Sequence, residues 1–382
     1  MFVRFCLIFI VYIGHIHTYE YPFSTSGNTV IDATGATVRM KCANWPGSME
    51  TLMPEGLQHN SIENIVLLIK QMNLTCVRLT YSIDVTLQSN LTAYQSFSRL
   101  GLTSALQGFQ MNNPTLINAS VSSVFEAVLD TLGRANIAVL FDNHISKAMW
   151  CCSNTDGNGF WGDEYFNVDQ WLAGVRFMAQ KTLSRPFVVA MSLRNELRGP
   201  RQNRDDWYRY VVQGITEAIS STNPKLLVVV SGLNYDTDLT FIRTKPIQTL
   251  VPETIKNKIV YEGHWYSWSG YGPQDNCEKT KSGVNNAWGF ILEPNQPYTA
   301  PVWLTEFGTN VDDFKGDDKF IDCVQSFLQT SLTKQVSWFY WVLAGSYYSR
   351  QGHAESHESF GLLTDNWHDI KSKPFIDTLS KM

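Results

Sequence analysis

Residues 187–196 read FVVAMSLRNE, and this stretch decides the fold. It begins as a short run of β-branched and apolar residues, which is typical of a strand buried on both faces of a parallel sheet. It ends in Arg194, Asn195 and Glu196, so polar groups stand where the strand stops. Seven further apolar runs have the length of such a strand: 38–43, 76–81, 137–143, 226–231, 258–264, 302–306 and 337–342.

Amphipathic stretches lie between most of these strands. In residues 62–72 the apolar side chains recur at helical spacing, and residues 121–132 and 207–219 behave similarly. Strands that alternate with helices predict a parallel sheet. Eight such units with no proline- or serine-rich linker favour one domain, residues 19–382, folded as a closed (β/α)₈ TIM barrel. The polar, turn-rich segments 90–115 and 266–286 are predicted to be loops on its rim.

The N-terminus, residues 1–18, is predicted to be a signal peptide. Arg4 precedes an unbroken apolar run at residues 5–13, which a short polar stretch follows. This run is too short to span a bilayer, which takes roughly 20 apolar residues. We therefore expect a secreted, extracellular protein with no membrane span; a membrane-anchored N-terminus is the alternative.

Secretion changes how the cysteines are interpreted. Six cysteines remain after the signal peptide: Cys42, Cys76, Cys151, Cys152, Cys277 and Cys323. An even number in an oxidising compartment predicts up to three disulfides, with Cys277–Cys323 as the first choice. The adjacent Cys151 and Cys152 are not expected to share one partner. Sequons at Asn73, Asn90 and Asn118 fit glycosylation of an exported surface.

Composition and motifs exclude several classes of function. The net charge is −5, whereas nucleic-acid-binding proteins usually carry an excess of positive charge. No C-x-x-C pair suggests zinc, and residues 154–159 start like a calcium loop whose twelfth position is Tyr165 instead of glutamate. The acid- and histidine-rich segment 353–358 lacks an H-E-x-x-H pattern. We expect a carbohydrate-binding monomer with no metal and no cofactor.

Polar residues gather at the ends of the predicted strands, where the active site of a TIM barrel lies. The residues at these ends are Arg78, Asp142, Asn143, His144, Asn195, Glu196, His264, Tyr266, Glu306 and Trp341. Two glutamates at such a mouth suit a retaining glycosidase, whose carboxyl groups stand about 5–5.5 Å apart. We expect Arg78 to keep Glu306 ionised as the nucleophile and Tyr266 to donate a hydrogen bond to it. Glu196 would be held protonated as the acid.

The order of these residues resembles glycoside hydrolase family 5, the cellulase family, and most closely its plant and fungal extracellular cellulase-like members. Segments that carry the resemblance are CANWP at 42–46, WCC at 150–152, DGNG at 156–159, SLRNELRGP at 192–200 and GSYY at 345–348. The resemblance implies that Glu196 is the acid/base, Glu306 the nucleophile and Asn195 a ligand of the sugar 2-hydroxyl. It also implies that His144, His264 and Tyr266 hold the sugar and the nucleophile, and that Trp341 is the platform under the cleaved residue.

Several alternatives remain open at this point. The expected substrate is β-1,4-glucan, but β-mannan, a glucosylated lipid or a small β-glucoside would fit the same mechanism. A catalytically silent carbohydrate-binding barrel would be expected to have lost a catalytic carboxylate, and both are present. Arg78, His144, His264 and Trp341 could instead serve only the core. The same choice, between a sugar platform and a gap-filling core residue, applies to Trp45, Trp150, Trp161 and Trp268.

Overall fold

The computed structural model describes residues 19–382, so the predicted signal peptide lies outside the described residues. Eight parallel strands form a closed barrel in the order β10-β3-β4-β5-β6-β7-β8-β9, which confirms the predicted TIM barrel. The barrel strands are β3 (Lys41–Trp45), β4 (Cys76–Ser82), β5 (Ala138–Ile145), β6 (Val188–Ser192), β7 (Leu227–Val230), β8 (Ile259–His264), β9 (Val302–Phe307) and β10 (Trp338–Tyr340). All eight predicted strands are present, within a few residues of the expected bounds.

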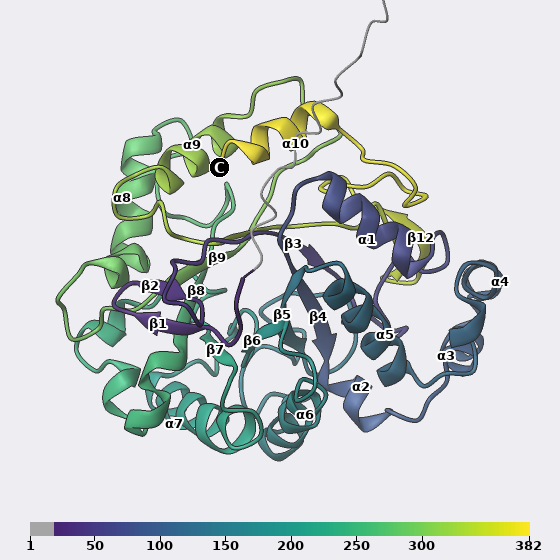
Figure 1. Ribbon diagram of the computed structural model, residues 1–382, viewed down its shortest axis with the longest axis horizontal. Helices are drawn as coiled ribbons and strands as arrows, with labels where there is room; N and C mark the ends of the chain where they lie inside the picture. The colour runs from purple at the N-terminus through teal and green to yellow at the C-terminus, as the bar shows by residue number, and fades with distance from the viewer. Residues whose placement is uncertain (1–18) are drawn as a thin grey trace, which may run out of the picture.

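Helices form a ring around the barrel (Figure 1). They are α1 (Ile62–Gln71), α2 (Ile83–Leu87), α3 (Ala93–Arg99), α4 (Thr103–Asn112), α5 (Val121–Arg134), α6 (Val168–Gln180), α7 (Arg204–Gln213), α8 (Cys277–Ala287), α9 (Lys319–Leu328) and α10 (Lys373–Ser380). Many begin at a Ser, Thr, Asn or Asp whose side chain accepts a backbone N–H of the first turn, as Ser61 does from Asn64. Between β7 and β8 the crossover contains three short 3₁₀ turns in place of an α-helix.

The amino-terminal half of the barrel interior is apolar. Its buried cluster contains Cys42, Cys76, Leu140, Ala190, Val229, Val260, Trp303 and Phe339 from the strands. Phe23 and Val30 of the small hairpin β1 (Ser24–Ser26) and β2 (Thr29–Ile31) pack against the same cluster, so this hairpin seals that end of the barrel.

The next layer toward the carboxyl ends of the strands is polar, although it is equally buried. It consists of Asn44, Arg78, Asp142, Ser192, Glu262 and Thr305. Most of these residues follow an apolar member of the lower layer by two positions, which is the spacing that keeps a side chain on the same face of a strand. The interior therefore changes from apolar to ionic along the barrel axis.

Two predicted loops are wrong in part. Residues 90–115 contain helices α3 and α4, which lie to one side of the barrel (Figure 1). Each is short and buries only three residues, among them Phe97 and Phe109, so the apolar periodicity is weak. Residues 266–286 include most of α8, which buries Val284 and is otherwise held by a disulfide, not by a broad apolar face.

Three disulfides are formed among residues 19–382. Cys277 pairs with Cys323 as predicted and joins α8 to α9, while Cys42 pairs with Cys76 across β3 and β4. The adjacent Cys151 and Cys152 are bonded to each other. The asparagines of all three sequons are exposed. Within the same described range, none of the helices is long and apolar enough to cross a membrane.

The lower layer generates a stability prediction. Trp303 is 1% exposed and its ring centroid lies 5.6 Å from that of Phe339 inside the barrel. Trp303→Ala should lower the free energy of unfolding by about 3–5 kcal/mol, because the closed barrel cannot collapse into the cavity. Urea unfolding followed by circular dichroism measures this loss. As a control, Leu67→Ala on the outer face of α1, where Leu67 is 55% exposed, should change it by less than about 0.5 kcal/mol. Equal effects of the two variants would contradict the layered core.

Candidate active site

A cavity of about 660 Å³ opens at the carboxyl ends of the barrel strands. Six of the eight predicted site residues line it: His144, Glu196, His264, Tyr266, Glu306 and Trp341. The other two, Arg78 and Asn195, are fully buried and bond to each other through Arg78 Nη2 and Asn195 Oδ1 at 2.8 Å. Arg78 also bonds to Glu306 at the wall of the cavity, so the structure brings all eight together.

A bulge in β9 turns Glu306 into this cavity. β8 pairs Gly263 with Leu304 and then His264 with Glu306, so β9 holds one extra residue at this point. The pairing of β9 with β10 loses its register over the same residues. A bulge re-aims side chains that would otherwise alternate between faces. As a result Thr305 and Glu306, although consecutive, both reach groups of the site.

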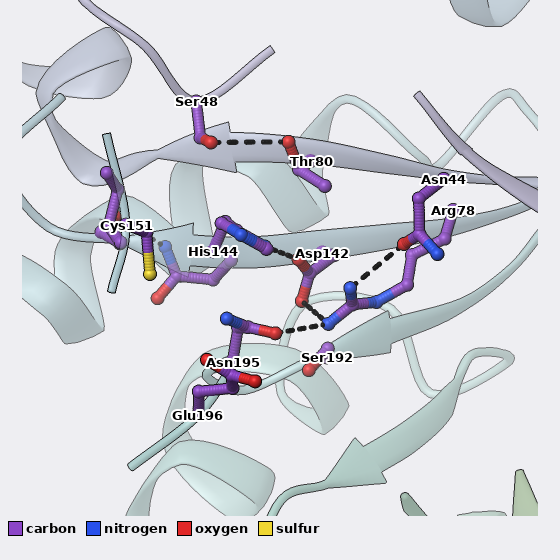
Figure 2. Close-up of polar contacts among 12 residues, drawn as sticks. Asn44, Ser48, Arg78, Thr80, Asp142, His144, Cys151, Ser192, Asn195 and Glu196 are labelled. Carbon is purple, nitrogen blue, oxygen red and sulfur yellow. Dashed lines mark hydrogen bonds and ion pairs between the residues drawn. The ribbon is translucent and has the colours of Figure 1, made fainter. Parts of the chain in front are cut away.

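Arg78 is the centre of the ionic layer. Its Nη1 donates to Glu306 Oε1 at 2.7 Å, and its Nη2 lies 3.1 Å from Asp142 Oδ1 and 3.7 Å from Glu262 Oε2. Figure 2 shows the contacts of this guanidinium with Asn44, Asn195 and Asp142. Burial alone would lower the pKa of Arg78, but the carboxylates outweigh burial and raise it above its ordinary value.

Asp142 links Arg78 to His144, because it contacts both side chains. Burial would raise the pKa of Asp142, but Arg78 and a hydrogen bond from His144 lower it below its ordinary value. Asp142 Oδ2 lies 2.8 Å from His144 Nδ1, a contact drawn in Figure 2. This bond fixes the ring of His144, which stacks on Trp341 at 5.4 Å and an interplanar angle of 11°.

Both oxygens of Glu306 accept hydrogen bonds. Arg78 donates to Oε1, and the hydroxyl of Tyr266 donates to Oε2 at 2.9 Å. Burial and the neighbouring Glu306 raise the pKa of Tyr266 well above its ordinary value, so the phenol keeps its proton and remains a donor.

Glu196 lies close to Glu306, but its side chain has a different environment. Burial raises the pKa of Glu196 above its ordinary value, although Arg198, His144 and Arg78 oppose the shift. Its backbone has a φ of 43°, in the left-handed region, and its N–H donates to Asp236 Oδ2 at 3.0 Å. Non-glycine residues rarely adopt this conformation, and when they do it is commonly at a functional site.

A chain of buried hydrogen bonds connects Glu196 to Glu262. His264 Nδ1 lies 2.9 Å from Glu196 Oε1, and His264 Nε2 lies 3.1 Å from Thr305 Oγ1, which is 2.8 Å from Glu262 Oε2. Burial lowers the pKa of His264 to about 4, so the ring is neutral at neutral pH. When Thr305 donates to Glu262, Nε2 must donate to Thr305. Nδ1 is then left as the acceptor that faces Glu196.

The predicted rim tryptophans divide into two pairs. Trp150 and Trp268 line the cavity, and Trp268 is 65% exposed and stacks on Tyr266 at 4.7 Å. Trp45 and Trp161 do not, which corrects their assignment as possible sugar platforms. Trp45 is fully buried and donates its indole N–H to the carbonyl of Glu55.

Trp161 is 3% exposed within an aromatic cluster that includes Phe166, Trp171 and Tyr210. Both Trp45 and Trp161 fill space beneath rim loops that fold back over the barrel. Their positions after strand ends could not distinguish this from a place in the cavity wall.

Several polar residues of the site were not singled out from the sequence. They are Asn44, Ser192, Asp236, Glu262 and Thr305. A usable signal existed for Glu262, because it stands two positions before His264 and so faces the same side of a strand, as Asp142 does before His144. Asp236 follows a loop, where no periodicity applies.

Groups with the donor atoms for a metal ion do occur among residues 19–382. Glu196, His264 and Glu306 place one oxygen or nitrogen each within 4.8 Å of one another, as do Asp236, Glu262 and His264. The guanidinium of Arg78 already pairs with Glu306 and Glu262, so a cation at either group would face a fixed like charge. A third group, His144 with Cys151 and Cys152, contains a disulfide and so lacks free thiolates.

The calcium-like and histidine-rich segments have other roles. Asp156 pairs with Arg198 at 2.6 Å. Glu358 accepts from Tyr347, and His357 bridges Asp312 and Asp365 at the base of the hairpin formed by β11 (Ser346–Arg350) and β12 (His353–His357).

Comparison with known proteins gives one family. A family model described as Cellulase (glycosyl hydrolase family 5) matches residues 31–346. A glycosyl hydrolase 5 family protein from Chamaecyparis obtusa is 38% identical over 379 residues, which cover 96% of this chain but only 66% of that protein. An endoglucanase from Paenibacillus polymyxa is 24% identical over 90% of this chain and 83% of its own length.

Solved structures share the fold. The catalytic domain of the major endoglucanase from Xanthomonas campestris pv. campestris superposes with a TM-score of 0.73 at 20% identity, covering 94% of this chain and 99% of that domain. An endocellulase from Pyrococcus horikoshii, in a complex of a single-residue variant with cellotetraose, gives a TM-score of 0.72 at 18% identity over 94% and 97% of the two chains.

The ionic layer generates a prediction about stability and pH. Arg78→Met should lower the free energy of unfolding at pH 7 by about 3–5 kcal/mol, because it leaves buried carboxylates without their counter-charge. The lowered pKa of Asp142 means that Arg78 stabilises the fold above pH of about 4 and that this contribution is lost as the pH falls. The difference between wild type and variant should therefore be large at pH 7 and shrink as the pH falls below about 4.

Guanidinium chloride unfolding at several pH values measures this difference. Arg134→Met is the matched control, because Arg134 and Glu63 form an exposed pair at 3.8 Å and the change should be close to zero. A loss that persists undiminished well below a pH of about 4 would contradict the role of Arg78 as the counter-charge.

Proposed function

The chain belongs to glycosyl hydrolase family 5, and on that premise we propose that it is a retaining β-glycosidase that cleaves β-linked glucan. Glu306 acts as the nucleophile and Glu196 as the acid/base. The observation that carries the proposal is that carboxyl oxygens of the two residues lie within 4.8 Å of each other. Inverting enzymes need about 6.5–9.5 Å to hold a water between the carboxyl groups, whereas retaining enzymes need about 5–5.5 Å.

The two steps follow from the different settings of the two glutamates. In the first, Glu306 attacks the anomeric carbon while Glu196 gives its proton to the departing oxygen. Arg78 and Tyr266 hold the attacking carboxylate in place. In the second, the glycosyl ester removes the negative charge of Glu306, and Glu196, now ionised, takes a proton from the attacking water.

Three further residues would bind the sugar. The Oδ1 of Asn195 is occupied by Arg78, so its Nδ2 is the atom left to donate to the sugar 2-hydroxyl. That hydrogen bond strengthens in the transition state and supplies part of the rate enhancement. His144 and Trp341, stacked on each other, form a rigid wall beside it.

β-1,4-glucan is the first choice of substrate. The support comes from relatives and structural neighbours that are named endoglucanases and from the cellotetraose held by the Pyrococcus horikoshii protein. Trp268 and Trp150 both line the cavity, and Trp268 is 65% exposed, which suits a substrate of several sugar units. β-Mannan, glucosylated lipids and small β-glucosides are tested beside it. Three disulfides fit our further proposal that the protein is secreted.

Covalent labelling tests the nucleophile. Incubation with 2,4-dinitrophenyl 2-deoxy-2-fluoro glycosides of glucose, cellobiose and mannose should add the mass of one glycosyl unit to the intact protein, mapped by peptide analysis to Glu306. The fluorine slows both steps, and the reactive leaving group lets the intermediate accumulate.

Glu306→Ala should abolish this label and turnover, while Glu278→Ala, on an 83% exposed side chain, should leave both unchanged. A folded protein that takes no label from any of the sugars would contradict the retaining mechanism. The same protein binding sugar without turnover would be a silent carbohydrate-binding barrel.

The pH profile tests the acid/base. Because the pKa of Glu196 is raised and the acid acts while protonated, kcat/KM should fall as the pH rises through that pKa. Glu196→Gln should lose this alkaline limb and reduce kcat/KM about 10²–10⁴-fold on glucan, with a smaller loss on substrates whose leaving group needs no proton. Kinetics across pH 4–9 measure both effects, and an alkaline limb that persists in Glu196→Gln would assign it to another group.

A further inference from the structure

The wall of the cavity contains a disulfide between consecutive residues. Cys151 and Cys152 both line the cavity, and both are half-buried. They follow β5 on the loop that also carries Trp150, and Figure 2 places Cys151 beside His144. The mechanism proposed above uses neither sulfur, so the role of this pair is unassigned.

The position of Asn195 relates the disulfide to a particular sugar. Asn195 Oδ1 accepts from Arg78, and Asn195 Nδ2 lies 4.0 Å from the Sγ of Cys152, which lines the cavity. Sulfur is a weak acceptor, so this contact leaves the amide free to donate to a sugar hydroxyl. The atom proposed to bind the 2-hydroxyl therefore stands against the disulfide.

We propose that the Cys151–Cys152 disulfide is a sugar-contact surface in the subsite that holds the glycosyl unit attacked by Glu306. This inference rests on the proposed function. Closure of an eight-membered ring joins two side chains into one surface that is apolar, polarisable and without rotational freedom of its own. Such a surface packs against the C–H groups of a sugar without requiring a hydrogen bond, and binding costs it no side-chain entropy.

The neighbouring Trp150 is itself held in place by two side chains. The ring of Trp150 packs edge-on against Tyr347 at 5.6 Å, and the guanidinium of Arg350 lies 4.7 Å above the Trp150 ring. Cys151 also borders a small internal space shared with His144 and Trp341. The disulfide thus continues a rigid wall that His144 and Trp341 begin.

Reduction would change this wall specifically. A dithiol reductant passes two electrons and two protons to the disulfide, giving two thiols, and is itself oxidised to its cyclic disulfide. The ring then opens into two rotatable side chains that must be ordered again when sugar binds. Of the other disulfides, Cys42–Cys76 is fully buried, whereas Cys277 of the α8–α9 bridge is half-buried like Cys151 and Cys152, so the peptide map must show which bridge has been reduced.

The test compares kinetics before and after reduction. The folded protein is treated with dithiothreitol, alkylated with iodoacetamide and mapped by peptide mass, and kcat and KM are measured with p-nitrophenyl β-cellobioside. With Cys151 and Cys152 modified, KM should rise about fivefold or more while kcat changes less than twofold, the pattern of lost binding shared by ground and transition states. An unchanged KM with both cysteines modified overturns the proposal, as does a loss confined to kcat.

Two double variants separate this disulfide from the others. Cys151→Ala/Cys152→Ala should show the raised KM without reductant and should not respond to dithiothreitol. Cys277→Ser/Cys323→Ser is the matched control and should keep the response of wild type. If the control loses the response, the effect belongs to the α8–α9 bridge and the proposal fails.

Labelling by the 2-fluoro glycosides distinguishes this inference from the proposed function. If Glu306 takes no label in the oxidised protein, the proposed function fails. If Glu306 is labelled at the same sugar concentration before and after reduction, only the role of the disulfide is overturned.

Discussion

One buried guanidinium organises the functional half of this barrel. Arg78 stands in a layer from which water is excluded, among Asp142, Glu262 and Glu306. Isolated charges cannot be buried at such depth without partners, so the guanidinium and the carboxyl groups around it hold one another in place. The guanidinium also fixes the amide of Asn195, and through Asp142 it fixes the ring of His144. The orientation of Asn195 and His144 therefore depends on one side chain that never reaches the cavity.

The two glutamates differ because the surrounding groups differ. Glu306 meets donors at both oxygens, whereas the side chain of Glu196 meets a neutral imidazole in a setting that disfavours charge. Identical side chains thus acquire opposite tasks from their neighbours. The backbone contributes as well, since Glu196 and the loop of Asn234, Tyr235 and Asp236 all have left-handed φ angles and are joined by hydrogen bonds.

The fold and the principal site residues could be predicted from the sequence because both follow short-range rules. Buried parallel strands are apolar runs, and barrel chemistry stands at their ends, so segments such as 187–196 carry both signals together. Helices α3 and α4 were missed because they bury too few residues to show a period. The burial of Trp45 and Trp161 depends on how distant loops fold over them, and the role of Asp236 depends on a turn far from Glu196 in sequence. Contacts of this kind have no local pattern from which to infer them.

The bulge in β9 interrupts the regular strand pairing and orients Glu306 toward the cavity. Without the extra residue, β9 would pair in step with both neighbours, and Glu306 would alternate outward toward the helices. An insertion or deletion of a single residue in this strand would therefore decide which face of the sheet carries the Glu306 side chain. Conversely, a relative that keeps every polar side chain of the site but lacks this one-residue irregularity would be recognisable from its strand register alone as a barrel whose equivalent of Glu306 faces away from the cavity.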